Sequence, residues 1–332
     1  MTRPEPALSV VVPMFNEESV LPLLVERLRG VLDGLGEAYE VVAVDDGSTD
    51  GTAARLTTVR GDWPELRVLR LRRNSGHQAA LVAGVLRARG RYVLSIDADL
   101  QDPPEVIVEM LRRARTDELD VVYGVRVDRS RDTAFKRWTA AGYYRLMRRL
   151  VGQQVPAHAG DFRLLSRAVV EALRELPERS PVLRLVVPWL GFRSGEVTYE
   201  RQQRAAGRTK YPLSRMAALA AESVTSFSAA PLRVATWLGL AGVAVCGVLV
   251  VVAVLAWFAG ATVTGWPSLY MAILFLGAVQ LLCLGLLGEY VARIYTIVQG
   301  RPAYVVASDS AAGSPARGIP DGDVVELADS LR

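Results

Sequence analysis

Charge is missing from one long part of this chain. No Asp, Glu, Lys or Arg occurs among the 55 residues from Val234 to Gly288. A membrane-spanning helix needs about 20 apolar residues, so this run predicts two spans, at about 234–258 and 268–288. A pair of buried core helices is the alternative, although such helices rarely continue this far without a charge. Basic residues flank the run and none lies between the spans, which favours both ends on the cytoplasmic side.

Cysteine is scarce, and several common motifs are absent. Cys246 and Cys283 are the only cysteines and both lie in the uncharged run, which excludes a disulfide framework and a CxxC zinc site. The net charge of +4 is modest and no basic stripe is interleaved with aromatic residues, so nucleic acid is not expected as a partner. The N-terminal run LSVVVPMF is too short for a signal peptide. No GxGxxG or GxxxxGK[ST] follows an expected strand, which excludes a dinucleotide fold and a P-loop.

What the first half contains is an alternation of short β-branched runs with amphipathic helices. We expect strands at residues 9–12, 40–44, 67–71, 92–96 and 120–123. Between them, residues such as Val20, Leu24 and Leu28 recur at helical spacing. This alternation predicts an α/β fold with a mostly parallel sheet that is covered on both faces. Ligands of such sheets bind at the carboxyl ends of the strands.

Four polar segments follow the first four expected strands. They are PMFNEE (13–18), DDGSTDGT (45–52), RNSGHQ (73–78) and DADLQD (97–102). Helix capping and tight turns would explain each segment singly, but not the gathering of at least five carboxylates at one rim. Asp97 and Asp99 are two residues apart on an extended turn, so both are expected on one side. Oxygen ligands of this kind suit Mg²⁺ or Mn²⁺, and we expect that cation to carry a diphosphate.

The ordered set of motifs resembles the family 2 glycosyltransferases of GT-A fold. The likeness is specific to polyprenyl-phosphate glycosyltransferases related to dolichyl-phosphate mannosyltransferase, of the bacterial type with two transmembrane helices. It covers about residues 8–300 and is carried by PMFNE (13–17), DDGSTDGT (45–52), DADLQ (97–101), GDFR (160–163) and SFSAAPLR (226–233). The resemblance implies inverting transfer of a hexose from a nucleotide sugar to polyprenyl phosphate, and a homo-oligomer, with a tetramer suspected. UDP-glucose is the first choice of donor, ahead of GDP-mannose and UDP-N-acetylhexosamine.

The resemblance also assigns the donor side of the site. It places the nucleotide sugar at Pro13, Phe15, Glu17, Asp45 or Asp46, Asp97, Ala98, Gln101 and Lys210. It places the metal and the diphosphate at Asp97, Asp99 and Gln101, with Asp99 among the catalytic residues. For His77 we expect a role in orienting the Asn74 turn or a nucleotide phosphate rather than acid-base work.

The acceptor side follows from the chemistry of a phosphate nucleophile. A phosphate monoester is largely dianionic near neutrality, its second pKa being about 6, so cations to position it matter more than a base. The predicted cations are Arg126, Arg129, Arg131, Lys136 and Arg163, with Arg126 and Arg131 as the catalytic candidates. A solvated helix face is the alternative for residues 126–137. Asp161 is the candidate base, and the alternative is that it positions Arg163.

The predicted organisation has four parts. Residues 1–210 form a cytosolic GT-A domain, 211–233 amphipathic juxtamembrane helices, 234–292 the two transmembrane helices, and 303–332 a disordered cytosolic tail. The amphipathic part either lies at the membrane interface or packs on the catalytic domain. The expected location is the bacterial inner membrane. A processive polysaccharide synthase is disfavoured because QxxRW is absent, and a catalytically silent membrane scaffold because the acidic set is intact.

Overall fold

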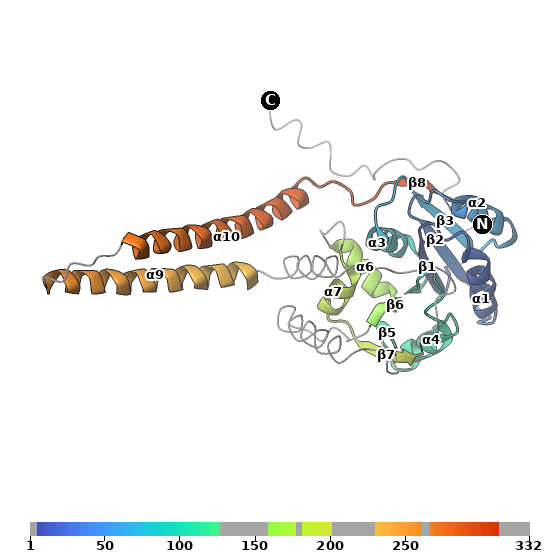
Figure 1. Ribbon diagram of the computed structural model, residues 1–332. Helices are drawn as coiled ribbons and strands as arrows, with labels where there is room; N and C mark the ends of the chain where they lie inside the picture. Colours follow the sequence, from blue (N-terminus) through green and yellow to red (C-terminus); the bar gives the residue numbers. More distant parts are fainter. Residues whose placement is uncertain (1–4, 127–158, 177–180, 201–229, 260–265, 312–332) are drawn as a thin grey trace, which may run out of the picture. The chain divides into compact units, whose positions relative to one another are not determined.

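The computed structural model describes residues 5–126, 159–176, 181–200, 230–259 and 266–311 (Figure 1). These residues belong to two compact units. A sheet unit contains the described residues up to 200 together with 302–311, and a helical unit contains 230–259 and 266–301. Each unit is described by itself below.

The sheet unit alternates strands and helices along the chain. In order its elements are β1 (Leu8–Met14), α1 (Leu21–Asp33), β2 (Tyr39–Asp45), α2 (Thr52–Asp62), β3 (Leu66–Leu71), α3 (His77–Arg87), β4 (Tyr92–Ser95), α4 (Val106–Thr116), β5 (Val121–Arg126), β6 (Ala159–Ser166), α6 (Arg167–Glu175), α7 (Leu183–Trp189), β7 (Ser194–Tyr199) and β8 (Val306–Asp309). The five strands expected from the sequence are confirmed as β1 to β5.

The strands form one eight-stranded sheet in the order β7-β5-β6-β4-β1-β2-β3-β8. The pairs β1 with β2, β1 with β4, β2 with β3, and β5 with β7 are parallel. Strand β6 is antiparallel to both β4 and β5, and β8 is antiparallel to β3. The sheet is therefore more mixed than expected, although β1 to β5 and β7 point the same way and their carboxyl ends form one rim.

Helices cover both faces of this sheet because the central strands are apolar on both sides. Every residue of β1 is buried. Val10 and Val12 join the core cluster that contains the inner faces of α1 and α4. On the opposite face, α3 packs so closely that a Cβ on Gly84 would lie 2.3 Å from Cγ1 of Val11. Helices α1 and α4 thus cover one face, and α3 and α6 the other (Figure 1).

The C-terminal strand corrects one expectation. The interpretation of 303–332 as a disordered tail is wrong for residues 306–309, which form β8 at the edge of the sheet. The Arg67 guanidinium makes two hydrogen bonds to the carboxylate of Asp309, at 2.8 and 2.5 Å. The backbones of Val68 and Ser310 are joined by a further bond of 3.0 Å. An edge strand offers unpaired backbone groups to any extended segment. The periodicity of residues 306–309 therefore does not indicate that they pair with β3.

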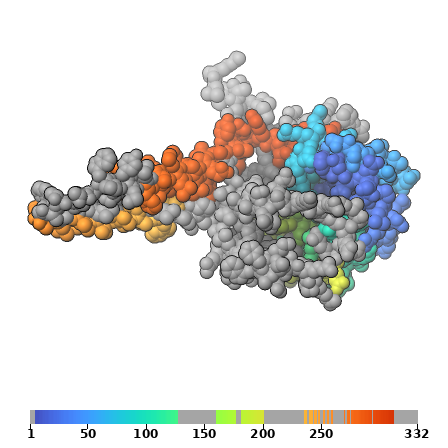
Figure 2. Space-filling view, viewed as in Figure 1, coloured from blue at the N-terminus to red at the C-terminus, as the bar shows by residue number. Residues whose placement is uncertain are grey.

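The helical unit consists of α9 (Ala230–Phe258) and α10 (Trp266–Val298). The two helices lie side by side (Figure 2). Cys283 Sγ is 4.0 Å from the carbonyl oxygen of Ala235, and Leu276 is the neighbour of Gly242, so the helices run antiparallel. Within the described residues, Phe275–Val298 is long and apolar enough to cross a membrane, with a mean hydropathy of 1.7. Most of the amphipathic segment expected at 211–233 lies outside the described residues, because the structure describes only its last four positions, 230–233.

Candidate active site

The predicted rim encloses a cavity of about 300 Å³. It lies at the carboxyl ends of β1, β2 and β4 and at the first turn of α3. Eight of its lining residues are among those expected for donor and metal: Pro13, Phe15, Glu17, Asp46, His77, Asp97, Ala98 and Asp99. The remaining lining residues are Met14, Asn74 and Ala80. Four loops separate in sequence therefore build one pocket, as the strand alternation predicted.

The loop after β4 places the acidic pair. Leu100 has a left-handed backbone with φ of 58° and a buried side chain, and this turns the chain so that the Gln101 amide donates to Asp99 Oδ1 at 3.2 Å. Both Asp97 and Asp99 line the cavity. Gln101 is buried and is not among the lining residues. The loop thus presents two of the three predicted metal ligands to the cavity.

One oxygen of the Asp97 carboxylate lacks a hydrogen-bond donor. Its Oδ1 is buried and has no hydrogen-bond partner within the described residues. Burial raises the pKa of Asp97 to about 6, and the neighbouring charges of Asp161, Asp102 and Asp99 act in the same direction against the opposing effect of His77. Within the described residues, no three His, Cys, Asp or Glu side chains form a metal cage. Mg²⁺ commonly binds one or two carboxylates and completes its shell with substrate phosphates and water, so the Asp97 and Asp99 pair fits such a cation.

The two acids after β2 have different surroundings. Asp46 lines the cavity, and its carboxylate accepts the amides of Ser75 at 2.7 Å and Gly76 at 2.9 Å. Burial raises the pKa of Asp46 in spite of these bonds. Asp45 is fully buried and accepts the Ser48 amide at 2.9 Å, so it supports the turn from inside. The sequence left the choice between Asp45 and Asp46 open, and the structure places Asp46 at the cavity.

Glycine brings the second and third loops together. Gly47 has φ of 70°, and a Cβ there would lie 2.6 Å from the backbone carbon of Arg73. A side chain at this position would push the loop 73–78 away from the loop 45–52. On the other side, Asn16 Oδ1 accepts the Thr49 amide at 2.9 Å. The three loops therefore hold one another, and Phe15, which is 42% exposed, lines the cavity.

His77 lies between two carboxylates. Its Nε2 is 3.2 Å from Asp161 Oδ2 and 3.6 Å from Asp97 Oδ1. The hydrogen bond to Asp161, together with the Asp97 charge, raises the pKa of His77 against the effect of burial. Helix α3 fixes this position because His77 is its first residue. His77 therefore connects the acidic loop to β6, a connection that the sequence analysis did not anticipate.

Asp161 is held by several donors. Its Oδ1 accepts from Arg163 Nη2 at 2.6 Å, and its Oδ2 accepts from Gln78 Nε2 at 3.1 Å. Burial alone would raise its pKa, but the His77 hydrogen bond and the charges of Arg163 and Arg184 hold the pKa of Asp161 well below its usual range. Arg163 is 1% exposed and does not line the cavity. The structure brings Asp161 and Arg163 together in the way that the positioning alternative expects.

Arg126 lies at the end of β5, in contact with two residues of the same unit. Its Nε donates to Tyr199 Oη at 3.1 Å, and its Nη2 donates to Asp102 Oδ2 at 3.3 Å. The Asp102 charge raises the pKa of Arg126 although burial opposes it. The other predicted cations, Arg129, Arg131, Lys136 and Lys210, lie outside the described residues. Tyr199 was missed by the sequence analysis, since nothing near it in the chain indicates a partner 97 residues away.

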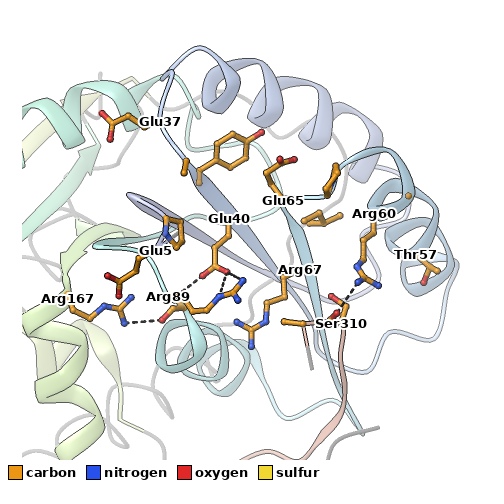
Figure 3. A pocket seen from close by; sticks show the side chains of 18 of the residues that line it. Glu5, Glu37, Glu40, Thr57, Arg60, Glu65, Arg67, Arg89, Arg167 and Ser310 are labelled. Atoms are coloured by element: carbon orange, nitrogen blue, oxygen red, sulfur yellow. Dashed lines mark hydrogen bonds and ion pairs between the residues drawn. The ribbon is translucent and has the colours of Figure 1, made fainter. Parts of the chain in front are cut away.

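A larger hollow of about 1010 Å³ lies at the opposite end of the strands, where their amino termini gather (Figure 3). Charged side chains dominate it, and several of them pair with one another or with backbone carbonyls. Arg89 makes an ion pair with Glu40 at 2.8 Å, and Arg174 one with Glu171 at 2.6 Å. Arg60 donates to the carbonyl oxygen of Ser310 at 2.9 Å. These pairs account for much of the charge in the larger hollow, whereas the smaller cavity contains the predicted donor and metal residues.

Comparison with known proteins identifies the family. The profile of "Glycosyl transferase family 2" matches residues 9–174. The chain is 40% identical over 302 residues to the uncharacterized glycosyltransferase YkcC of Bacillus subtilis, covering 90% of this chain and 92% of that one. It is 39% identical over 302 residues to the SfII prophage-derived bactoprenol glucosyl transferase of Shigella flexneri, covering 90% and 97%. The chain belongs to glycosyltransferase family 2.

A solved structure agrees on the fold. The glucosyl-3-phosphoglycerate synthase of Mycobacterium tuberculosis, in complex with Mn²⁺, uridine diphosphate and glucosyl-3-phosphoglycerate, is 19% identical with a TM-score of 0.50. The match covers 66% of this chain and 78% of that one. The expected GT-A type of α/β domain is confirmed. The sheet unit is thus a family 2 glycosyltransferase domain whose acidic cavity lies at its carboxyl rim.

Proposed function

We propose that this protein transfers glucose from UDP-glucose to a polyprenyl phosphate, with inversion at the anomeric carbon. Relatives with the name bactoprenol glucosyl transferase support this proposal, because they match at 37 to 39% identity over about nine-tenths of the chain. Transfer from GDP-mannose is the alternative, since no described contact reads the base or the sugar. The homo-oligomer implied by the resemblance stays a prediction.

The donor side of the proposal rests on the cavity. Asp97 and Asp99 would hold a divalent cation, which supplies positive charge to the leaving diphosphate when it is bound. Phe15 would offer its exposed ring to the base, and Asp46, fixed by two backbone amides, would face the ribose or the base. The Oδ1 of Asp97, which has no hydrogen-bond donor within the described residues and only the more distant His77 beside it, supports this reading, because a buried carboxylate oxygen is costly unless it is hydrogen-bonded or neutralised.

The state of Asp161 carries the acceptor side of the proposal. General-base catalysis is most efficient when the pKa of the base lies near the working pH, and the pKa of Asp161 is held far below it. Asp161 is thus a weak base and a well-held anchor for His77 and Arg163. A hydroxyl acceptor would need a proton removed, whereas a phosphate acceptor is already anionic. The site supports a phosphate as the nucleophile, with Asp161 in a positioning role.

The path of the chain supports a membrane hairpin. Strand β8 follows α10 and pairs with β3, which precedes α9 in the sequence. Both ends of the α9 and α10 pair therefore lead into the same sheet unit. If α10 crosses a membrane, a second crossing is needed to bring β8 back to that sheet, and α9, with no charged residue after Arg233, is the helix that can supply it. We place the catalytic domain and both ends of the hairpin on the cytoplasmic side of a bacterial inner membrane.

A transfer assay tests the reaction. Membranes containing the protein would be incubated with Mn²⁺, undecaprenyl phosphate and labelled UDP-glucose, GDP-mannose or UDP-N-acetylglucosamine. We expect labelled lipid from UDP-glucose, and loss of that label in EDTA. Label from GDP-mannose alone would replace glucose by mannose in the proposal. Failure to bind any nucleotide sugar in the presence of Mn²⁺ would point instead to a membrane scaffold without activity.

Cysteine labelling tests the topology. In a variant that lacks Cys246 and Cys283, a cysteine would replace Ser268 near the start of α10 or the exposed Ser308 of β8. An impermeant maleimide added to intact cells should label position 268, and position 308 should react only after lysis. Labelling of position 308 in intact cells would place the sheet unit outside and overturn the proposed orientation.

A further inference from the structure

Arg126, a predicted acceptor cation, contacts two buried polar residues that have no role in the mechanism so far. We name Asp102, Arg126 and Tyr199 together the rim clamp. Tyr199 Oη donates to Asp102 Oδ1 at 2.5 Å and accepts from Arg126 Nε at 3.1 Å. Arg126 Nη2 completes the triangle at 3.2 Å from Asp102 Oδ1. Asp102 is 0% exposed and Tyr199 5%.

The rim clamp joins three segments that carry predicted site residues. Asp102 ends the acidic loop that contains Asp97 and Asp99. Arg126 and Tyr199 are the last residues of β5 and β7, and they are partners in the register of these parallel strands. After Arg126 the chain continues to the predicted acceptor cations, and after Tyr199 it continues to Lys210. The rim clamp thus joins the end of the donor-side acidic loop to the starts of the two segments that follow β5 and β7.

Packing fixes the Tyr199 ring, so its hydroxyl has a defined position. Phe162 packs edge-on against the ring, with centroids 5.5 Å apart and planes at 85°. Gly124 leaves room for both rings, because a Cβ there would lie 2.6 Å from Phe162 and 3.1 Å from Tyr199. A hydroxyl placed this rigidly can hold the guanidinium that donates to it.

The guanidinium of Arg126 keeps donors for another partner. An arginine has five N–H donors, and the contacts within the described residues use Nε and Nη2. Its side chain is 25% exposed. It also packs over Gly160, where a Cβ would lie 3.0 Å from Nη2, so it lies next to the residue that precedes Asp161. A phosphate at this point would meet a planar cation whose orientation is already set.

We infer that Tyr199 and Asp102 are positioning residues which hold the Arg126 guanidinium in the orientation that binds the acceptor phosphate. This inference rests on the proposed function, since it names the side chains that orient a predicted acceptor cation. A buried carboxylate shared by an arginine and a tyrosine is not needed for stability alone, because apolar side chains of similar volume often stabilise a fold equally well. The shared carboxylate of Asp102 serves instead to hold Arg126 and Tyr199 in one relative orientation.

Tyr199→Phe tests the inference, because it keeps the ring and removes the hydroxyl. We expect the KM for undecaprenyl phosphate to rise about tenfold, which is the effect of losing one oriented charge-assisted contact. The KM for the nucleotide sugar, and its binding in the presence of Mn²⁺, should stay within about twofold of the parent. Equal losses toward donor and acceptor would overturn the inference, since they would mean a general effect on the rim.

Tyr39→Phe is the matched control. Tyr39 Oη accepts from Trp63 Nε1 at 2.9 Å and donates to Asp33, so this hydroxyl has the same kinds of partner as that of Tyr199. It lies at the opposite edge of the sheet, where β2 begins. Tyr39→Phe should lower the melting temperature and leave the KM for the acceptor unchanged. A rise in acceptor KM equal to that of Tyr199→Phe would show that any lost tyrosine hydroxyl has this effect and would overturn the inference.

A double variant shows whether Tyr199 acts through Arg126. If it does, Tyr199→Phe combined with Arg126→Gln should raise the acceptor KM no further than Arg126→Gln alone. Independent, multiplying effects would overturn the inference. If Tyr199→Phe does not fold, Asp102→Asn replaces it, with the same expected selective rise in acceptor KM. A parent protein that transfers sugar only to a hydroxyl acceptor would fail the proposed function itself, an outcome separate from these variants.

Discussion

Acids at the two ends of the strands of this sheet have different surroundings. At the amino-terminal edge, Glu40 is 4% exposed and accepts from Ser9 Oγ, the Arg89 amide and the Arg89 guanidinium. At the carboxyl rim, Asp97 has a buried Oδ1 with no hydrogen-bond partner among the described residues and a raised pKa. We expect the acid with several hydrogen-bond donors to contribute to stability, and the acid whose oxygen lacks a donor to bind a ligand.

The same difference separates the two hollows. The larger one is bordered by charged side chains of which several pair with one another, such as Arg89 with Glu40 (Figure 3). The smaller one is bordered by acids that the fold crowds together. Size therefore does not identify the site in this protein. The state of the polar groups distinguishes the two hollows, because ionisable groups with strongly shifted pKa values cluster at functional sites.

The largest effect should come from the rim. Asp99→Asn keeps the shape of the side chain and removes its charge, so it should lower kcat by about a hundredfold or more, the range found when a group that stabilises developing charge is lost. Its melting temperature should stay close to that of the parent. Isothermal titration with Mn²⁺ and UDP-glucose should show weaker binding of the metal. Parental activity of Asp99→Asn would remove this residue from the catalytic set.

The matched change at the opposite edge should affect stability instead. Glu40→Gln turns one acceptor oxygen into a donor that faces other donors, so we expect a loss of about 1–2 kcal/mol in the free energy of unfolding. Once the protein is folded, its kcat and both KM values should equal those of the parent. Chemical denaturation and the transfer assay measure the two quantities. A selective kinetic defect would show that the amino-terminal edge contributes to catalysis.

A smaller effect sharpens the comparison through pH. The carboxyl of Asp97 has a pKa of about 6 when folded, against about 4 in an unfolded chain. Between these values the folded protein binds more protons, so its stability falls as the pH rises. Asp97→Asn removes this loss. In EDTA the variant should be more stable than the parent above pH 6, by about 1 kcal/mol after allowance for solvent screening, and equal to it below pH 4.

The opposite result would be informative. A variant less stable than the parent at pH 7 would mean that Asp97 has a stabilising partner in the metal-free protein, and that the contrast between rim and edge is weaker than described. Repeating the measurement with saturating Mn²⁺ gives the control. The metal should stabilise the parent and have little effect on Asp97→Asn.

Much of the site could be predicted because it follows from local order along the chain. Strands β1, β2, β3 and β4 alternate with helices, so their carboxyl ends had to gather, and with them Phe15, Asp46, His77 and Asp97. The contacts that span long separations could not be predicted. His77 meets Asp161 and Tyr199 meets Asp102 only because β6 inserts between β4 and β5 and because β7 pairs with β5.

By itself, then, the sequence determined the α/β class, the acidic rim and the uncharged C-terminal run, because periodicity and local composition decide which residues are buried and which strands share a rim. Only the tertiary structure decided that Asp46 rather than Asp45 lines the cavity, that Asp161 is held by Arg163, and that residues 306–309 add a strand to β3. Each of these outcomes depends on the order and direction of strand pairing. Backbone hydrogen bonds form equally well for many pairings, so that order is fixed by the packing of the whole domain.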